Sequence, residues 1–102
     1  MGARGATDPV TAEYAALCAE ALAEAERLHE AWTRSGDSGA LLAARLVGLL
    51  RDELDRAQRG ELPPPEHGFP LTRFVGDYEW RPEGTTVVER VYAMQRYWQQ
   101  HT

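Results

Sequence analysis

The distribution of apolar and polar residues predicts a first helix over residues 9–34. In this stretch apolar side chains recur every three or four positions, which is the spacing of one face of an α-helix. The members of this stripe are Val10, Tyr14, Leu17, Ala21, Ala25, Leu28 and Trp32. Asp8 and Pro9 precede the stripe, and an aspartate N-cap followed by proline is a typical helix start. We therefore expect a long helix that packs along one face.

A second helix is predicted over residues 38–59, and its two halves differ in polarity. Residues 40–50 are almost entirely apolar, with Arg45 as the single charge. A surface helix has one apolar stripe, whereas an apolar surface all round indicates burial on more than one face. We expect this helix to begin in a core and to end in water.

The second half, residues 51–59, is polar. Two acid-before-base pairs stand at the favourable spacing of four residues, namely Asp52 with Arg56 and Asp55 with Arg59. Ser38 or Asp37 is expected to cap the first turn of this helix, and Gly60 is expected to end it.

The short segment 35–39 predicts that the two helices form an antiparallel hairpin. Gly48 costs about 1 kcal/mol of helix stability relative to alanine, which indicates a packing reason for it. We expect a row of small side chains on the second helix to face a row of alanines on the first. The two rows are Ala40, Ala44 and Gly48, and Ala12, Ala16, Ala19 and Ala23. The large leucines of the second helix then point elsewhere and need a cover.

A connector rich in proline and aromatic residues is predicted over residues 60–85. Its prolines break the helix and favour an extended chain. Two alternatives stay open for its second half. It forms either a short helical turn or a small β-hairpin that pairs residues 71–75 with residues 78–81.

A third helix is predicted over residues 87–100. Thr86 and Glu89 match a capping box at its start. Its apolar stripe consists of Val87, Val91, Met94 and Trp98. The fold class is therefore mainly α: a long helical hairpin plus a C-terminal helix, resembling a three-helix bundle. We expect residues 9–102 to form one domain behind a disordered segment, residues 1–8.

The composition and charge of the chain restrict the cellular location and the partners that we expect. The formal net charge of −5 argues against nucleic-acid binding, which needs a basic surface. No apolar run is long enough to span a membrane, and the N-terminus lacks a signal-like core. Cys18 is the single cysteine, so a reducing, cytoplasmic location is expected. All eleven basic residues are arginine, which with the many alanines is typical of a GC-rich bacterial or phage genome.

The candidate chemistry is sparse. Glu26 and His29 lie three residues apart on the first helix, and di-iron bundles use such a unit twice with further carboxylates. A symmetric dimer would supply the second copy, but an exposed histidine on an acidic helix is the favoured interpretation. Cys18 lies in an apolar pattern and is expected to be buried and inert. No nucleotide-binding fingerprint occurs, so we expect no cofactor and favour a non-enzymatic role.

The candidate interaction surfaces come from surplus apolar and aromatic residues. A leucine face on the second helix predicts a two-fold homodimer; its members are Leu42, Leu46 and Leu49. The aromatic C-terminal third has two interpretations, a lid over these leucines or a hot spot for a partner. The rings in question are Trp80, Tyr97 and Trp98.

Three functional hypotheses follow. The favoured one is a non-catalytic helical module that binds a protein partner, as an adaptor, regulator or small subunit, and self-associates. The second is a helical bundle that binds a small molecule or a metal, with or without enzymatic activity. The third is a small subunit of a nucleoprotein complex, against which the acidic balance weighs.

Overall fold

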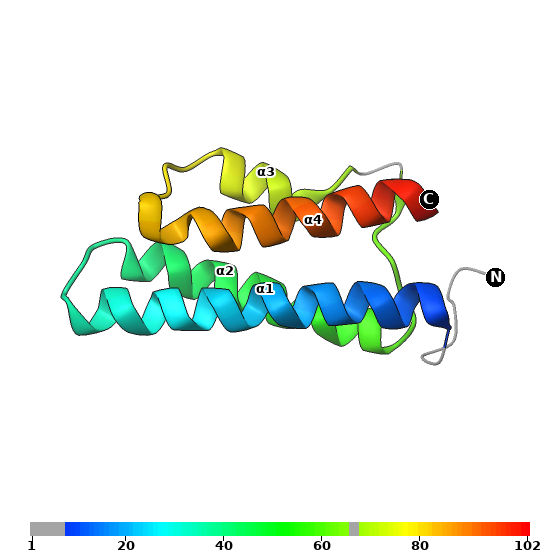
Figure 1. The fold of residues 1–102 in the computed structure, drawn as a ribbon, viewed down its shortest axis with the longest axis horizontal. Coiled ribbons are helices and arrows are strands. Elements are labelled where there is room, and N and C mark those ends of the chain that lie inside the picture. The colour runs from blue at the N-terminus through cyan, green and yellow to red at the C-terminus, as the bar shows by residue number, and fades with distance from the viewer. Residues whose placement is uncertain (1–7, 66–67) are drawn as a thin grey trace.

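A computed structural model of the chain describes residues 8–65 and 68–102. Within them are four α-helices, the 3-10 turn η2 and no strand. The elements are α1 (Pro9–Arg34), α2 (Ala40–Gln58), α3 (Pro70–Gly76), η2 (Pro82–Gly84) and α4 (Thr85–His101). Figure 1 shows α2 returning alongside α1, while α4 lies along α1 and carries α3 against it. The predicted mainly α fold, a helical hairpin plus a C-terminal helix, is confirmed.

Helix α1 has the predicted bounds and starts with the predicted cap. The Asp8 carboxylate accepts a hydrogen bond from the Val10 amide at 2.7 Å. Its buried face consists of Thr11, Tyr14, Cys18, Ala21, Ala25, Leu28 and Trp32. Leu17, a member of the predicted stripe, is half-buried, and Cys18 takes the place beside it. Of the segment predicted to be disordered, residues 1–7 lie outside the described residues.

Helix α2 ends at the predicted glycine and begins differently. Gly60 adopts φ of 84° and donates to the Ala57 carbonyl at 2.9 Å, which closes the helix. At the start the N-cap is Gly39, and no side chain caps the first turn. Instead Asp37 accepts from the Gly39 amide at 2.7 Å and so orders the turn itself.

The predicted contact between two small-residue rows is wrong. Gly48 is exposed, and a Cβ built there would meet nothing within 4 Å. The outer alanines of α1 are likewise exposed or half-buried. The hairpin buries the opposite face of α2, whose members are Ala43, Leu46, Val47, Leu50, Glu53 and Ala57. Small side chains of α1 (Ala21 and Ala25) and large ones of α2 (Leu46 and Leu50) share this core, because small positions leave room for large ones across an interface.

The short helix α3 forms in the connector, which decides between the two alternatives. Pro70 occupies the first position of α3, where a proline fits a helix. The Thr72 hydroxyl donates to the Phe69 carbonyl at 3.0 Å, and Leu71 and Val75 turn inward one helical turn apart. The β-hairpin of residues 71–75 and 78–81 is not formed.

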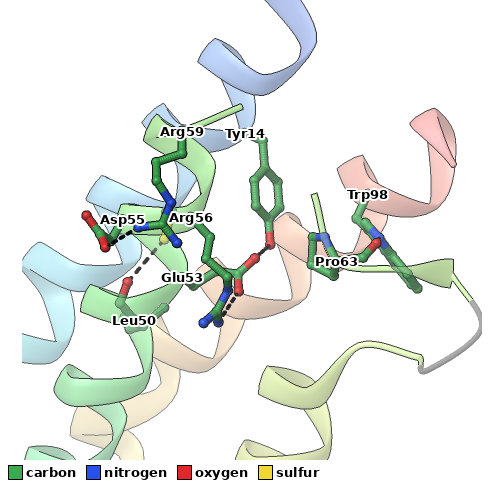
Figure 2. Close-up of polar contacts among 9 residues, drawn as sticks. Tyr14, Leu50, Glu53, Asp55, Arg56, Arg59, Pro63 and Trp98 are labelled. Atoms are coloured by element: carbon green, nitrogen blue, oxygen red, sulfur yellow. Dashed lines mark hydrogen bonds and ion pairs between the residues drawn. The ribbon is translucent and has the colours of Figure 1, made fainter. Parts of the chain in front are cut away.

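Helix α4 carries the predicted buried stripe but lacks the predicted capping box. It starts at Thr85, directly after η2, with Gly84 as N-cap and no side-chain cap bond. A Cβ on Gly84 would lie 3.1 Å from the Trp80 Cβ, so the close packing of this indole shapes the helix start. At the other end the Trp98 indole donates to the Pro63 carbonyl at 2.6 Å, tying α4 to the proline segment (Figure 2).

Replacing Gly48 with alanine is expected to stabilise the chain. Gly48 lies inside α2 with φ in the helical range and open space around a Cβ, so the change lowers the entropy of the unfolded chain without a clash. The free energy of unfolding should rise by up to about 1 kcal/mol. Urea denaturation followed by circular dichroism measures this change in the free energy of unfolding. A loss of stability would show that a side chain at position 48 clashes with a neighbouring part of the chain.

Candidate functional site

A polar cluster lies buried between α1 and α2. The Tyr14 hydroxyl donates to Glu53 Oε2 at 2.6 Å, and the Arg56 guanidinium donates to Glu53 Oε1 at 2.8 Å (Figure 2). Glu53 is only 4% exposed. A buried carboxylate is tolerated when it is paired and hydrogen-bonded, and both of its oxygens are bonded here. Arg56 therefore bonds Glu53 rather than the predicted partner Asp52.

The buried residue Glu53 is the feature that sequence reasoning missed. It lies in the polar half of α2, whose residues are predicted to face water. A signal was present, because the positions of Leu46, Leu50, Glu53 and Ala57 continue a single helical stripe of spacing four, three and four. Of the two predicted pairs in this half, Asp55 with Arg59 is observed at 2.6 Å.

The Tyr14 hydroxyl and the Cys18 thiol beside this cluster both have raised pKa values. Burial raises the pKa of the Tyr14 hydroxyl well above its ordinary value, and the adjacent Glu53 carboxylate raises it further. Burial, and then the same carboxylate, raises the pKa of the Cys18 thiol to about 12. Cys18 Sγ donates to the Leu50 carbonyl at 3.4 Å. Both groups are neutral donors near neutral pH, which suits a structural role and not a nucleophile.

Removing the Tyr14 hydroxyl is expected to destabilise the fold. In Tyr14→Phe the Glu53 carboxylate loses its 2.6 Å donor while it stays buried, so the free energy of unfolding should fall by about 1–3 kcal/mol. Chemical denaturation near neutral pH measures this. Tyr92→Phe, on an exposed tyrosine of α4, is the matched control and should change little. Equal stability of both variants would refute the structural role of this bond.

The Cys18 thiol is expected to resist alkylation in the folded chain. At about pH 8, near the pKa of an ordinary thiol, iodoacetamide should label the urea-unfolded chain rapidly and the native chain only through unfolding. The reason is the pKa of about 12 together with complete burial. Mass spectrometry counts the adduct over time, and rapid labelling without denaturant would contradict the packing described above.

The candidate metal pair lies in an open groove between α1 and α2. Glu26, His29 and Glu30 line this groove of about 400 Å³, with Gly48 and Arg51 on the α2 side. Arg51 donates to Glu26 at 2.8 Å, so the carboxylate that a metal would need is held by a guanidinium. Among the described residues no group of three or more histidine, cysteine, aspartate or glutamate side chains is placed to hold a metal. The pair thus gains no third ligand.

The three leucines of the predicted dimer face do not lie on one exposed surface. Leu46 is fully buried inside the single chain, Leu42 is half-buried and Leu49 is 39% exposed. Leu46 belongs to the core that buried side chains of all four helices share, and α2 packs mainly against α1. Leu46 is therefore a core residue, and only Leu49 of the three reaches solvent substantially.

The three aromatic residues that were candidates for a partner hot spot differ in how deeply they are buried. Trp98 is buried in the core. Tyr97 is half-buried and donates to the Val10 carbonyl at 2.9 Å, which joins α4 to the start of α1. Trp80 is half-buried, donates to the Val75 carbonyl at 2.9 Å and stacks on Trp32 with ring centroids 6.3 Å apart.

The exposed aromatic of the connector is Tyr78, which sequence analysis did not single out. It is 44% exposed and lines two hollows, one of about 410 Å³ and one of about 320 Å³. Apolar side chains on both sides complete what we call the Tyr78 surface: Leu41, Leu42, Tyr78, Trp80 and Val88. Tyr78 lies in an irregular segment, where no periodicity marks which side chains reach solvent.

Several side chains that border the larger hollow are held by contacts between different segments. Leu41, 79% exposed, lies on the first turn of α2 at its edge. Arg81 on the opposite edge pairs with Asp37 and lies over the Trp32 ring at 5.8 Å. The Arg45 guanidinium lies 5.8 Å from the Phe74 centroid, which joins α2 to α3 beside the hollow. This surface is therefore preformed by the turn between α1 and α2 and by the segment after α3.

Comparison of the chain with models of protein families, with curated proteins and with solved structures finds no match. Within residues 8–65 and 68–102, none of the helices combines the length and the apolar character that crossing a bilayer requires. The functional argument consequently depends on the surfaces and the buried cluster described above.

Proposed function

We propose that this chain is a small, non-catalytic helical module that binds another protein, as an adaptor, a regulator or a small subunit of a larger complex. The carrying observation is the Tyr78 surface, where a partly exposed tyrosine separates two hollows whose linings combine apolar and charged side chains. Aromatic anchors and the pockets beside them account for most of the binding energy at protein interfaces. With its one cysteine buried and unpaired, the module suits a reducing compartment such as the cytoplasm.

The geometry favours a partner that inserts apolar side chains on either side of Tyr78. Leu41 and Leu42 offer apolar contact in the larger hollow, and Trp80 and Val88 do so in the smaller one. The hydrogen bond of Trp80 and its stacking on Trp32 hold this wall in place, so little side-chain entropy is lost on binding. The buried polar groups Tyr14 and Glu53 bond each other inside the fold and support it.

The test compares tagged wild-type chain with Tyr78→Ala, each expressed in the source cells and purified gently without chelators. We expect a protein that copurifies in stoichiometric amount with the wild type and is depleted at least about tenfold with Tyr78→Ala, as for a hot-spot residue. Quantitative mass spectrometry measures the retained protein. Tyr92→Ala is the matched control, because Tyr92 is similarly exposed at 39% on α4.

Two outcomes would contradict this function. One is equal retention of every copurifying protein by the wild type and both variants. The other is a native mass spectrum in which the chain carries a stoichiometric small molecule or metal and no protein, which would favour the ligand-binding hypothesis.

A further inference from the structure

The face of α2 opposite the core presents an exposed stripe of four residues: Leu41, Arg45, Gly48 and Asp52. Their spacing of four, three and four places them on one line of the helix surface. We call this line the α2 stripe. It differs from the leucine face considered above, because Leu46 points into the core and Leu49 only borders the stripe.

Two opposite charges on the stripe are left without an ion pair. Arg45 and Asp52 are seven residues apart, which is two turns and about 10 Å along the axis, too far to pair with each other. Within the described residues neither forms an ion pair: Arg45 lies over Phe74, and Arg56, the basic neighbour of Asp52, bonds Glu53. Each is exposed and available to a charge from another molecule.

We propose that a second copy of this chain binds the α2 stripe, with the two α2 helices antiparallel about a two-fold axis between Gly48 and Leu49. In such a pair, positions equally distant from the axis on opposite sides face each other. Arg45 and Asp52 are two such positions. Arg45 of each copy therefore meets Asp52 of the other, and the symmetry forms this ion pair twice.

The centre of the stripe suits close approach of two backbones. Gly48 has no side chain, and a Cβ built on it would meet nothing within 4 Å. Leu49, 39% exposed, then lies against Gly48 of the second copy. At the ends Leu41, 79% exposed, covers the aliphatic part of Arg56 of the second copy. Both exposed leucines, Leu41 of the stripe and Leu49 beside it, thus gain a contact.

The expected association is weak, because two crossing helices bury less area than a standard interface. We expect a dimer with a dissociation constant in the micromolar range that weakens as salt is raised. The stripe shares Leu41 with the Tyr78 surface, and Arg45 lines the same hollow as Tyr78, but the inference is argued from the charges of the stripe and does not rest on the proposed function. Sedimentation equilibrium from about 10 µM to about 1 mM covers the range for the untagged full chain.

The decisive experiment exchanges the two charges. Arg45→Asp places aspartate against aspartate, and Asp52→Arg places arginine against arginine, each twice per dimer. Each variant alone should self-associate at least about tenfold more weakly than the wild type. An equimolar mixture of the two should associate like the wild type, because both cross-pairs regain opposite charges. The double variant should also recover.

The control is Arg96→Asp, the same charge change at an exposed position of α4, which should leave association unchanged. Circular dichroism verifies that each variant is folded, and recovery in the mixture excludes misfolding as the cause. A wild type that stays monomeric to about 1 mM, or a mixture that stays as weak as its components, would overturn the inference. Tyr78→Ala should self-associate normally, so failure of partner capture and failure of dimerisation are separate results.

Discussion

The buried carboxylate of Glu53 is the constraint on which the hairpin depends. An ionic group inside a protein is strongly destabilising unless its partners are in place. One partner, Tyr14, comes from α1 and the other, Arg56, from the next turn of α2. The two helices can satisfy this carboxylate in only one register, since a slip by one turn would move the Tyr14 hydroxyl about 5 Å away. Apolar burial stabilises the hairpin, and this bond selects its alignment.

Aromatic side chains hold the C-terminal third on the hairpin. The ring of each packs against apolar neighbours, and its N–H or O–H group donates one hydrogen bond. Trp98 is buried between helices while its N–H bonds the Pro63 carbonyl, and Tyr97 reaches the Val10 carbonyl. Trp80 does likewise with Val75. Indole and phenol groups usually find a hydrogen-bond partner when they are buried. For these three rings the acceptors are backbone carbonyls of the connector, of the first turn of α1 and of the end of α3. These bonds fix where the connector lies, and with it the exposed ring of Tyr78.

The sequence allowed the helices to be predicted but not the faces by which they pack, because helices are defined by local signals and packing is not. Periodicity and end signals such as Asp8 and Gly60 define helices locally, and the first helix was predicted to the residue. Which face of α2 is buried depends on the neighbouring helices, and the small row around Gly48 was assigned to the wrong side. Glu53 was missed because an acidic residue in a polar segment is expected to be solvated. Tyr78 was missed because short irregular segments have no period.

The buried and the exposed face of α2 differ in how their charged side chains are paired. On the inner face the carboxylate of Glu53 finds its partners within the chain. On the outer face Arg45 and Asp52 stand two turns apart, where helix geometry prevents them from pairing, although a spacing of four would have allowed it. Between them Gly48 lowers helix stability without filling any contact inside the chain. The exposed leucines of α2, Leu41 and Leu49, are ordinary when each is taken alone, because scattered apolar side chains are common on protein surfaces. The inference of a dimer therefore depends on the open glycine between two opposite charges that form no ion pair within the described residues, an arrangement that is complementary to a copy of itself.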